Sequence, residues 1–504
     1  MRVFKNFFFL LALISSCLLS SQTPYDDSPT LSTTENKSFK LIFRVSYFSN
    51  LFNVIDNLSL WGPRTYEKYI KYWKEKFDLS KDDEYYLKEY VKIRNKYRGR
   101  FIEDDELQNL IASRSLVPIP PHDSDLGKKF ILLFTGSMTM TELRNRAEIL
   151  MTNEDMNILF SIIEHFKPKF DEIWENTLYL HHKAEELSNL SGSEHVREML
   201  DSLAAFLGLK FEYPLEFELH LLWSPAVTQT HGQVVERYSL VELDPAENIV
   251  NEMDKHIHEI CHYLYDAIPP ESKINIINHF FKEHCIEGPL AYNIFYESLA
   301  VGIAQGLFIK KTLPEYFDFQ KSWYADPEID AYGKALFPLL EEYFKSGKTI
   351  NDRFVLRAVD QYKKAFKGRS ITPVSLLRYS FLFFRQNELN IQPFKKGLAV
   401  TSLWERSLDD DEEVNKFFHL FQGISGLVIL KENDLSYLRS IESELPRRKE
   451  DLLKLFSKEK CSIYAQKRKI NGYIFWICSP KKRLEEALNT FLNLKSIPKE
   501  PMIF

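Results

Sequence analysis

The residues best suited to chemistry in this sequence form one short run, His258-Glu259-Ile260-Cys261-His262. Two histidines four residues apart lie on the same face of a helix, so both imidazoles can reach a single metal ion. A glutamate directly after the first histidine is where a metal-assisted hydrolase holds its general base. Because the motif is short, the surrounding chain must supply independent support for this interpretation.

The helix that would carry the motif is predicted to begin at Asp244-Pro245-Ala246-Glu247. Aspartate is a favourable N-cap, proline suits the first helical position, and the glutamate completes an arrangement like a capping box. His258 and His262 should fall nearly opposite the apolar stripe of this helix, with Glu259 at their flank. That stripe consists of Ala246, Val250, Met253, Ile257, Ile260 and Leu264.

Two strands are predicted just before this helix, at Leu215–Trp223 and Val234–Leu243. Both segments alternate in polarity and are rich in Val, Leu, Tyr and Phe, which favours strands. They would belong to a small mixed sheet next to the helix that carries the motif.

A further carboxylate, Glu297, lies in the middle of residues 290–304, which are apolar almost all round and therefore predict a buried helix. A carboxylate in such a helix is unfavourable unless it is paired or coordinates a metal. Two imidazoles and one carboxylate make a zinc site that keeps its fourth position for water. The sequence thus offers a second clue that is independent of the pentapeptide.

Together, the strand, the H-E-x-x-H helix and the downstream helical glutamate resemble the gluzincin group of zinc metallopeptidases. The run A-Y-N-I-F-Y-E-S-L-A-V-G-I-A-Q-G around Glu297 is similar to poorly characterised bacterial secreted and lipoprotein members, as is the following Asp330-Ala331-Tyr332. The resemblance covers roughly residues 120–370, and its specific part is confined to 258–262 and 290–306.

The resemblance implies a Zn²⁺ cofactor held by His258, His262 and Glu297, with Glu259 as the base that activates the attacking water. It further implies a peptide or protein substrate, extended along the strand predicted at 234–243. A hydrogen-bond donor should stabilise the developing oxyanion. We expect Tyr332 in that role, with Tyr324 as the second choice.

The sequence departs from the gluzincin pattern at two points. Thermolysin-like members carry an aspartate four residues after the ligand glutamate, where it orients a histidine, and here that position is Val301. They also place the glutamate closer to the second histidine, a spacing that Glu283 or Glu287 fits better than Glu297, which comes 35 residues after His262. We favour Glu297 because its surroundings are apolar and match the motif.

The N-terminus predicts export. Arg2 and Lys5 precede the apolar run Phe7–Leu13, which is too short to span a membrane. The following Ile14-Ser15-Ser16-Cys17 resembles a bacterial lipobox, in which Cys17 would be lipidated. The alternative is cleavage near Ser20 or Ser21. The expected location is therefore the periplasm or a lipid anchor in the cell envelope, and any membrane contact would be through the N-terminal lipid.

The predicted fold class is α+β and mainly helical, with a zincin-like catalytic domain that has a small mixed sheet and an active-site helix, and a small C-terminal α/β domain. The expected divisions are a signal peptide (1–16), a flexible tether (17–38), a helical region (39–119), the catalytic domain (120–371) and the C-terminal domain (372–504). A net charge of −6 and the lack of a long basic run argue against nucleic acid as a partner.

The four remaining cysteines include Cys461 and Cys478, which flank a predicted hairpin turn at Asn471-Gly472. Pairing across a two-residue turn would set Cys478 opposite Ala465, too far from Cys461 for a disulfide.

A competing function is a catalytically inactive, envelope-anchored binding or scaffold lipoprotein that retains the zincin fold. Its support is the missing aspartate at Val301 together with the large flanking regions. The sequence does not indicate an oligomeric state.

Overall fold

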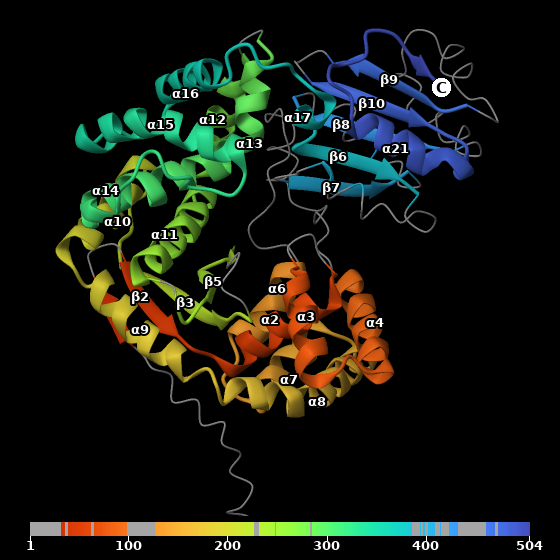
Figure 1. Ribbon diagram of the computed structural model, residues 1–504. Helices are drawn as coiled ribbons and strands as arrows, with labels where there is room; N and C mark the ends of the chain where they lie inside the picture. Colours follow the sequence, from red (N-terminus) through yellow and green to blue (C-terminus); the bar gives the residue numbers. More distant parts are fainter. Residues whose placement is uncertain are drawn as a thin grey trace, which may run out of the picture.

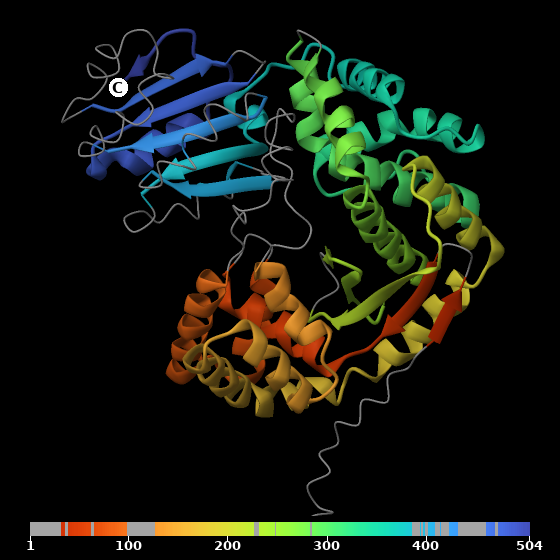
Figure 2. The same cartoon turned by 180° about the vertical axis from the view of Figure 1, so that it is seen from behind.

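The computed structural model describes residues 32–35, 39–61, 65–97, 126–225, 231–246, 248–282, 285–385, 394, 397–398, 402–408, 414, 423–431, 460–468 and 472–504. The predicted signal segment and Cys17 lie outside the described residues. The described elements form an open arc, from helices α2–α8 through a first sheet to a second group of helices and then a C-terminal sheet (Figure 1). The same arc is seen from behind in Figure 2.

The first sheet is mixed, with five strands in the order β1-β2-β3-β5-β4. Its middle strands β2, β3 and β5 run parallel, whereas the edge strands β1 and β4 are antiparallel to their neighbours. The strand predicted at 215–223 is confirmed as β3. The strands span Ser32–Glu35 (β1), Phe39–Arg44 (β2), Leu215–Trp223 (β3), Gly232–Val235 (β4) and Tyr238–Leu243 (β5).

The single strand predicted over 234–243 is wrong, because the chain reverses within it. Glu236 adopts a left-handed backbone with φ 51°, and Tyr238 pairs back onto Val235. The tight turn contains no glycine or proline, so the unbroken run of strand-forming residues concealed it. The reversal makes β4, rather than β5, the edge of the sheet.

The N-terminal half of the chain is mainly helical, as predicted. Thr139 and Thr152 cap two of its helices, since each side chain accepts a hydrogen bond from a backbone N–H three residues later. The helices are α2 (Tyr47–Ser59), α3 (Glu67–Phe77), α4 (Lys81–Lys96), α6 (Leu126–Thr135), α7 (Met140–Leu150), α8 (Asn153–Trp174), α9 (Leu178–Ser191) and α10 (Glu194–Phe206).

This half also contributes strands that the sequence analysis did not predict. Strand β1 falls within the predicted tether, and β2 begins the region predicted to be helical. Because β2 pairs in parallel with β3, the first sheet joins segments from both sides of residue 119.

The second group of helices packs around α13, which contacts α11, α12, α15 and α16, and α11 carries the histidine motif. Helix α13 continues into a π-helical stretch, Gly302–Phe308, that packs against α11 and α15. π-Helical turns often occur at functional sites. The helices are α11 (Ile249–Asp266), α12 (Pro270–Lys282), α13 (Glu287–Val301), α14 (Ile309–Thr312), α15 (Pro327–Lys345) and α16 (Asp352–Ala365).

The C-terminal region contains a six-stranded sheet in the order β11-β9-β10-β8-β6-β7. Strands β7, β6, β8 and β10 run parallel to one another, and β9 pairs antiparallel with both of its neighbours, β10 and β11. The elements are α17 (Pro373–Leu376), β6 (Tyr379–Phe384), β7 (Ser402–Ser407), β8 (Ser425–Leu430), β9 (Ser462–Lys467), β10 (Tyr473–Cys478), α21 (Leu484–Leu492) and β11 (Met502–Ile503). The described chain is thus mainly helical with two mixed sheets, which agrees with an α+β fold.

The hairpin register of β9 and β10 differs from the prediction. Cys478 lies opposite Ser462, and Ala465 lies opposite Phe475. The cause is a connection longer than two residues, closed by a hydrogen bond from Arg468 N to Gly472 O (2.8 Å). Cys461 and Cys478 are nevertheless free, because positions 461 and 462 point to opposite faces of the sheet.

In the described part of the chain, no helix combines the length and the apolar character that crossing a membrane requires.

Candidate metal centre

The apolar stripe of helix α11 fixes the side of the helix on which the histidine motif lies. Met253, Ile257, Ile260 and Leu264 are all fully buried on one side of the helix, as the spacing predicts. The helix begins at Ile249, later than expected, because the Asp244 side chain accepts from Ala246 N (2.8 Å) in a turn before it. The stripe thus anchors α11 and turns the opposite side toward neighbouring elements.

The motif side chains opposite this stripe are buried as well. His258 and Glu259 are each 7% exposed, and His262 is 5% exposed. The elements that pack on α11 include α13, the π-helical stretch and strand β4. Polar groups buried in this way need partners, and most of those partners come from α13.

Three donor atoms converge at this point. Glu297 Oε2 lies 3.3 Å from His258 Nε2 and 3.4 Å from His262 Nε2, and the two Nε2 atoms are 3.0 Å apart. A tetrahedral metal with ligand distances of about 2.0–2.1 Å places its donors about 3.3 Å from one another. The spacing and chemistry of the three side chains therefore suit one metal ion, and His258, His262 and Glu297 could hold it together.

The electrostatics of the group favour a charged carboxylate. Burial alone would raise the pKa of Glu297, but the adjacent His262 and His258 outweigh it and hold that pKa well below its usual value. Burial also opposes charge on His258, yet its hydrogen bond to Glu297 and the charge of that carboxylate raise the pKa of His258. Glu297 is thus ionised at neutral pH, as a metal ligand must be.

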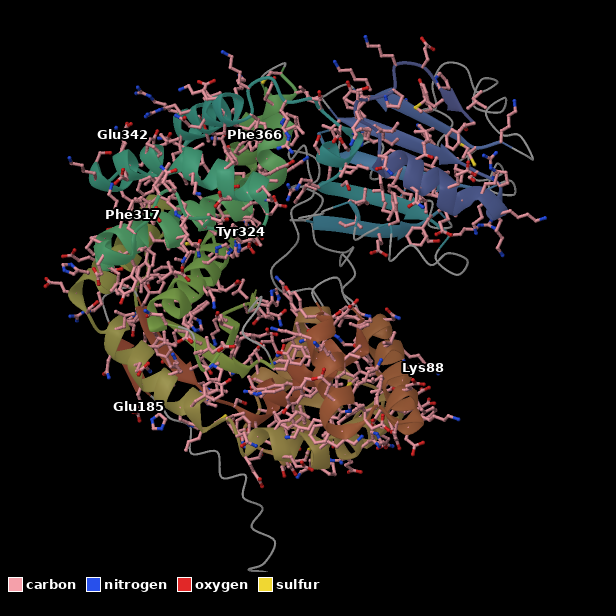
Figure 3. The ribbon with its side chains drawn as sticks, viewed as in Figure 1. Lys88, Glu185, Phe317, Tyr324, Glu342 and Phe366 are labelled. Atoms are coloured by element: carbon pink, nitrogen blue, oxygen red, sulfur yellow. The ribbon has the colours of Figure 1, made fainter. Side chains whose placement is uncertain are left out.

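Two tyrosine rings enclose the imidazoles. The ring of Tyr296 stacks on His262 with centroids 4.1 Å apart and planes 18° apart. Tyr324 lies nearly parallel to His258 (5.9 Å, 11°) and donates a hydrogen bond to Glu297 Oε2 (3.2 Å). Tyr324 lies toward the inner side of the arc, whereas Phe317, on the same connecting segment, lies toward the outer side (Figure 3).

Glu259 lies against the edge strand of the first sheet. A Cβ atom added at Gly232, the first residue of β4, would be 2.7 Å from Glu259 Oε1. Such a separation is below ordinary van der Waals contact, so only glycine lets the strand and the carboxylate approach this closely. The base expected from the sequence therefore sits between α11 and β4, one residue along the helix from His258.

If Glu259 acts as a general base, Gly232→Ala is expected to displace its carboxylate and to lower kcat about 10- to 100-fold, because ångström-scale misplacement of a reacting group has effects of this size. The melting temperature should change little, since the crowded atom is the end of a flexible side chain. Steady-state kinetics and thermal melting check this, with Val234→Ala on the same strand as the control. An unchanged kcat would show that Glu259 does not work from this position.

The structure does not bring Tyr332 to the site, which corrects our first choice of oxyanion donor. Tyr332 is fully buried in α15, where its hydroxyl donates to Ala358 O (3.1 Å) and its ring packs edge-on against Tyr362. The apolar spacing of α15 turns it into the core. The second choice, Tyr324, is the tyrosine that reaches the metal ligands.

The structure brings Glu297, rather than Glu287, to the histidines. Glu287 is the first residue of α13, about 15 Å along the axis from Glu297 at 1.5 Å per residue. Glu283 lies outside the described residues.

Val301 occupies the position at which thermolysin-like members carry an orienting aspartate, and its side chain is fully buried. It packs closely on α15, since a Cβ at Gly333 would be 2.8 Å from Val301 Cγ1. His262 Nδ1 is buried without a hydrogen-bond partner among the described residues. If its Nε2 faces a metal, Nδ1 carries the proton, and leaving that N–H unpaired costs roughly 1–3 kcal/mol.

Tyr296 and Gly232 also belong to the site, although the sequence pattern does not single them out. For Tyr296, the available signal was its position directly before Glu297. For Gly232, it was a glycine at the start of a strand-forming run.

No protein-family model, curated protein or solved structure matched this chain. Its chemistry must therefore be argued from the site.

Proposed function

We propose that this chain is an exported zinc-dependent peptidase. The observation that carries the proposal is the convergence of His258, His262 and Glu297, with the carboxylate of Glu259 beside them. Two imidazole nitrogens and one carboxylate oxygen suit zinc, whereas calcium and magnesium prefer all-oxygen sites. Three protein ligands leave a coordination position open, as catalytic zinc sites do.

Each residue has a definite task in this proposal. When bound, zinc polarises the scissile carbonyl and lowers the pKa of the attacking water. Glu259 accepts the proton of that water on a carboxylate oxygen and returns it to the leaving amine nitrogen. The Tyr324 hydroxyl, now directed at Glu297 Oε2, is close enough to turn toward the carbonyl oxygen as negative charge develops there.

Strand β4 gives the substrate a place to lie. It is the edge strand next to β5, so its outer backbone groups can pair with an extended peptide. Gly232 at its start is in contact distance of Glu259, and a peptide paired along β4 would therefore pass the base. The edge differs from the predicted one because the chain reverses at Glu236.

Tyr324→Phe is expected to lower kcat about 10²- to 10³-fold, the usual effect of removing one oxyanion donor. Zinc affinity should fall less than kcat, because the ring beside His258 stays in place while Glu297 loses one hydrogen bond. The matched control is Tyr332→Phe, which removes only the bond to Ala358 O. It should cost about 1 kcal/mol of unfolding free energy and leave kcat unchanged. Equal kcat values for the two variants would remove Tyr324 from the mechanism.

Export and lipidation at Cys17 are proposed from the N-terminal sequence alone. The protein would then act in the periplasm or on the envelope, with membrane contact through the lipid and with peptides or proteins as partners.

The function is tested by metal analysis and a cleavage assay. We expect one zinc per chain in protein purified without chelators, and cleavage of a mixed peptide library that chelation abolishes and added zinc restores. Protein without stoichiometric metal would contradict the zinc site. Zinc-loaded protein that cleaves no peptide would instead support the inactive binding or scaffold lipoprotein. That function is favoured by Val301 and by His262 Nδ1, with which no described residue pairs.

A further inference from the structure

None of the described residues forms a hydrogen bond with Nδ1 of His262. Metal-ligating histidines almost always donate their second ring N–H to a carboxylate, a carbonyl or water, which fixes the plane of the ring. Here Nδ1 of His262 is buried with no partner in the described part of the chain, and Val301 occupies the position where an aspartate would have provided one. A ring stacked on the imidazole can hold it in the direction of the other two donors instead.

The ring of Tyr296 covers one face of that imidazole. With centroids 4.1 Å apart and planes 18° apart, rotation of His262 about its Cβ–Cγ bond would drive its edge into the tyrosine ring. A stack of this kind fixes the plane of the imidazole without a hydrogen bond. Because Tyr296 directly precedes Glu297, helix α13 delivers both a ligand and the group that orients another ligand.

Tyr296 is itself held by three neighbouring residues, of which the Asp266 side chain is 37% exposed. Its hydroxyl donates to Asp266 Oδ2 (3.1 Å), at the last residue of α11. Tyr265 packs edge-on against its ring, with centroids 5.5 Å apart. Lys273, 8% exposed, donates to both Asp266 O (3.0 Å) and Asp266 Oδ1 (3.3 Å). A continuous set of contacts thus runs from Lys273 through Asp266 and Tyr296 to His262.

We propose that Tyr296 is the positioning residue that orients His262 for the metal by stacking, in place of a hydrogen-bonded carboxylate. This inference rests on the metal-binding part of the proposed function. Tyr296 touches neither the attacking water nor the peptide in this proposal, and it acts only through the imidazole plane. Its loss should therefore appear first in metal affinity.

The test compares zinc affinity, measured by competition with a chromogenic chelator, among variants of the full chain. Tyr296→Leu removes the flat ring and is expected to weaken zinc binding about 10- to 100-fold, the effect of losing an orienting partner. Tyr296→Phe keeps the stack but loses the bond to Asp266, and should stay within about 3-fold of the wild type. The visible spectrum of the cobalt-loaded protein should change for Leu and not for Phe.

The control is Tyr292→Leu, one turn earlier on α13. Tyr292 packs on Phe280, Phe281 and Tyr379 and stacks on neither metal-ligating histidine. It should lower the melting temperature as Tyr296→Leu does, yet bind zinc like the wild type. If Tyr296→Leu fails to fold, Tyr296→Met fills the same space without a flat face and carries the same expectation.

Three outcomes overturn the inference, and they are distinguishable. Wild-type zinc affinity in a folded Tyr296→Leu or Tyr296→Met variant would show that the stack orients nothing. If the Tyr292→Leu control weakened zinc binding equally, the effect of Tyr296→Leu would reflect a general loss of stability and not the loss of the stack. A wild-type protein that binds no zinc would remove the metal site itself, and with it the proposed function.

Discussion

Glu259→Gln is expected to leave zinc bound and to lower kcat about 10²- to 10⁴-fold, the range that a general base contributes. Glutamine has nearly the same shape as glutamate, so it should fit between α11 and Gly232 without displacing the strand. It cannot accept a proton at neutral pH, so the substitution removes the general-base step and leaves the metal ligands in place. Metal content by elemental analysis and cleavage of the best library peptide measure the two effects separately.

The control for this change is Glu287→Gln, at the far end of α13 from the site. It makes the same chemical replacement and should retain both zinc and activity. Full activity in Glu259→Gln would exclude Glu259 as the general base and would overturn the proposed mechanism. Loss of zinc in Glu259→Gln would indicate that Glu259 is a ligand rather than a base.

The local parts of the site could be predicted from the sequence because they depend on periodicity. The stripe of α11 fixes which side of the helix is buried in the core, and this places His258 and His262 on the opposite side. Glu297 was identifiable because an unpaired carboxylate in an apolar helix needs a partner. Both arguments use contacts within one helix, which the 3.6-residue repeat determines.

The predictions that were wrong concern features that depend on tertiary packing. Tyr332 and Tyr324 are eight residues apart, and only the packing of α15 decides that the first enters the core and the second reaches Glu297. The turn at Glu236 is held by pairing with β5, and its own residues carry no turn signal. Strand β2 pairs with β3 across a long stretch of chain, and such non-local pairing is not encoded in local patterns.

Glu297→Gln is expected to weaken zinc binding more than the roughly 10- to 100-fold that loss of an orienting partner causes, because it replaces a charged ligand by a neutral amide. The side chain keeps its size, and its amide oxygen can still accept the hydrogen bond from Tyr324, so the local packing should survive. Activity should fall with zinc occupancy and recover partly at high zinc concentration.

The measurement is zinc affinity by chelator competition, together with peptide cleavage as a function of added zinc. The comparison with Glu287→Gln again decides the assignment, because Glu287 fits the shorter ligand spacing of the thermolysin-like pattern. If Glu287→Gln lost zinc while Glu297→Gln bound it like the wild type, the third ligand would be misassigned and α13 would have to shift toward α11. The 3.3 Å and 3.4 Å separations of Glu297 Oε2 from the two imidazoles argue for the opposite result, since these donors already have the spacing of a tetrahedral site.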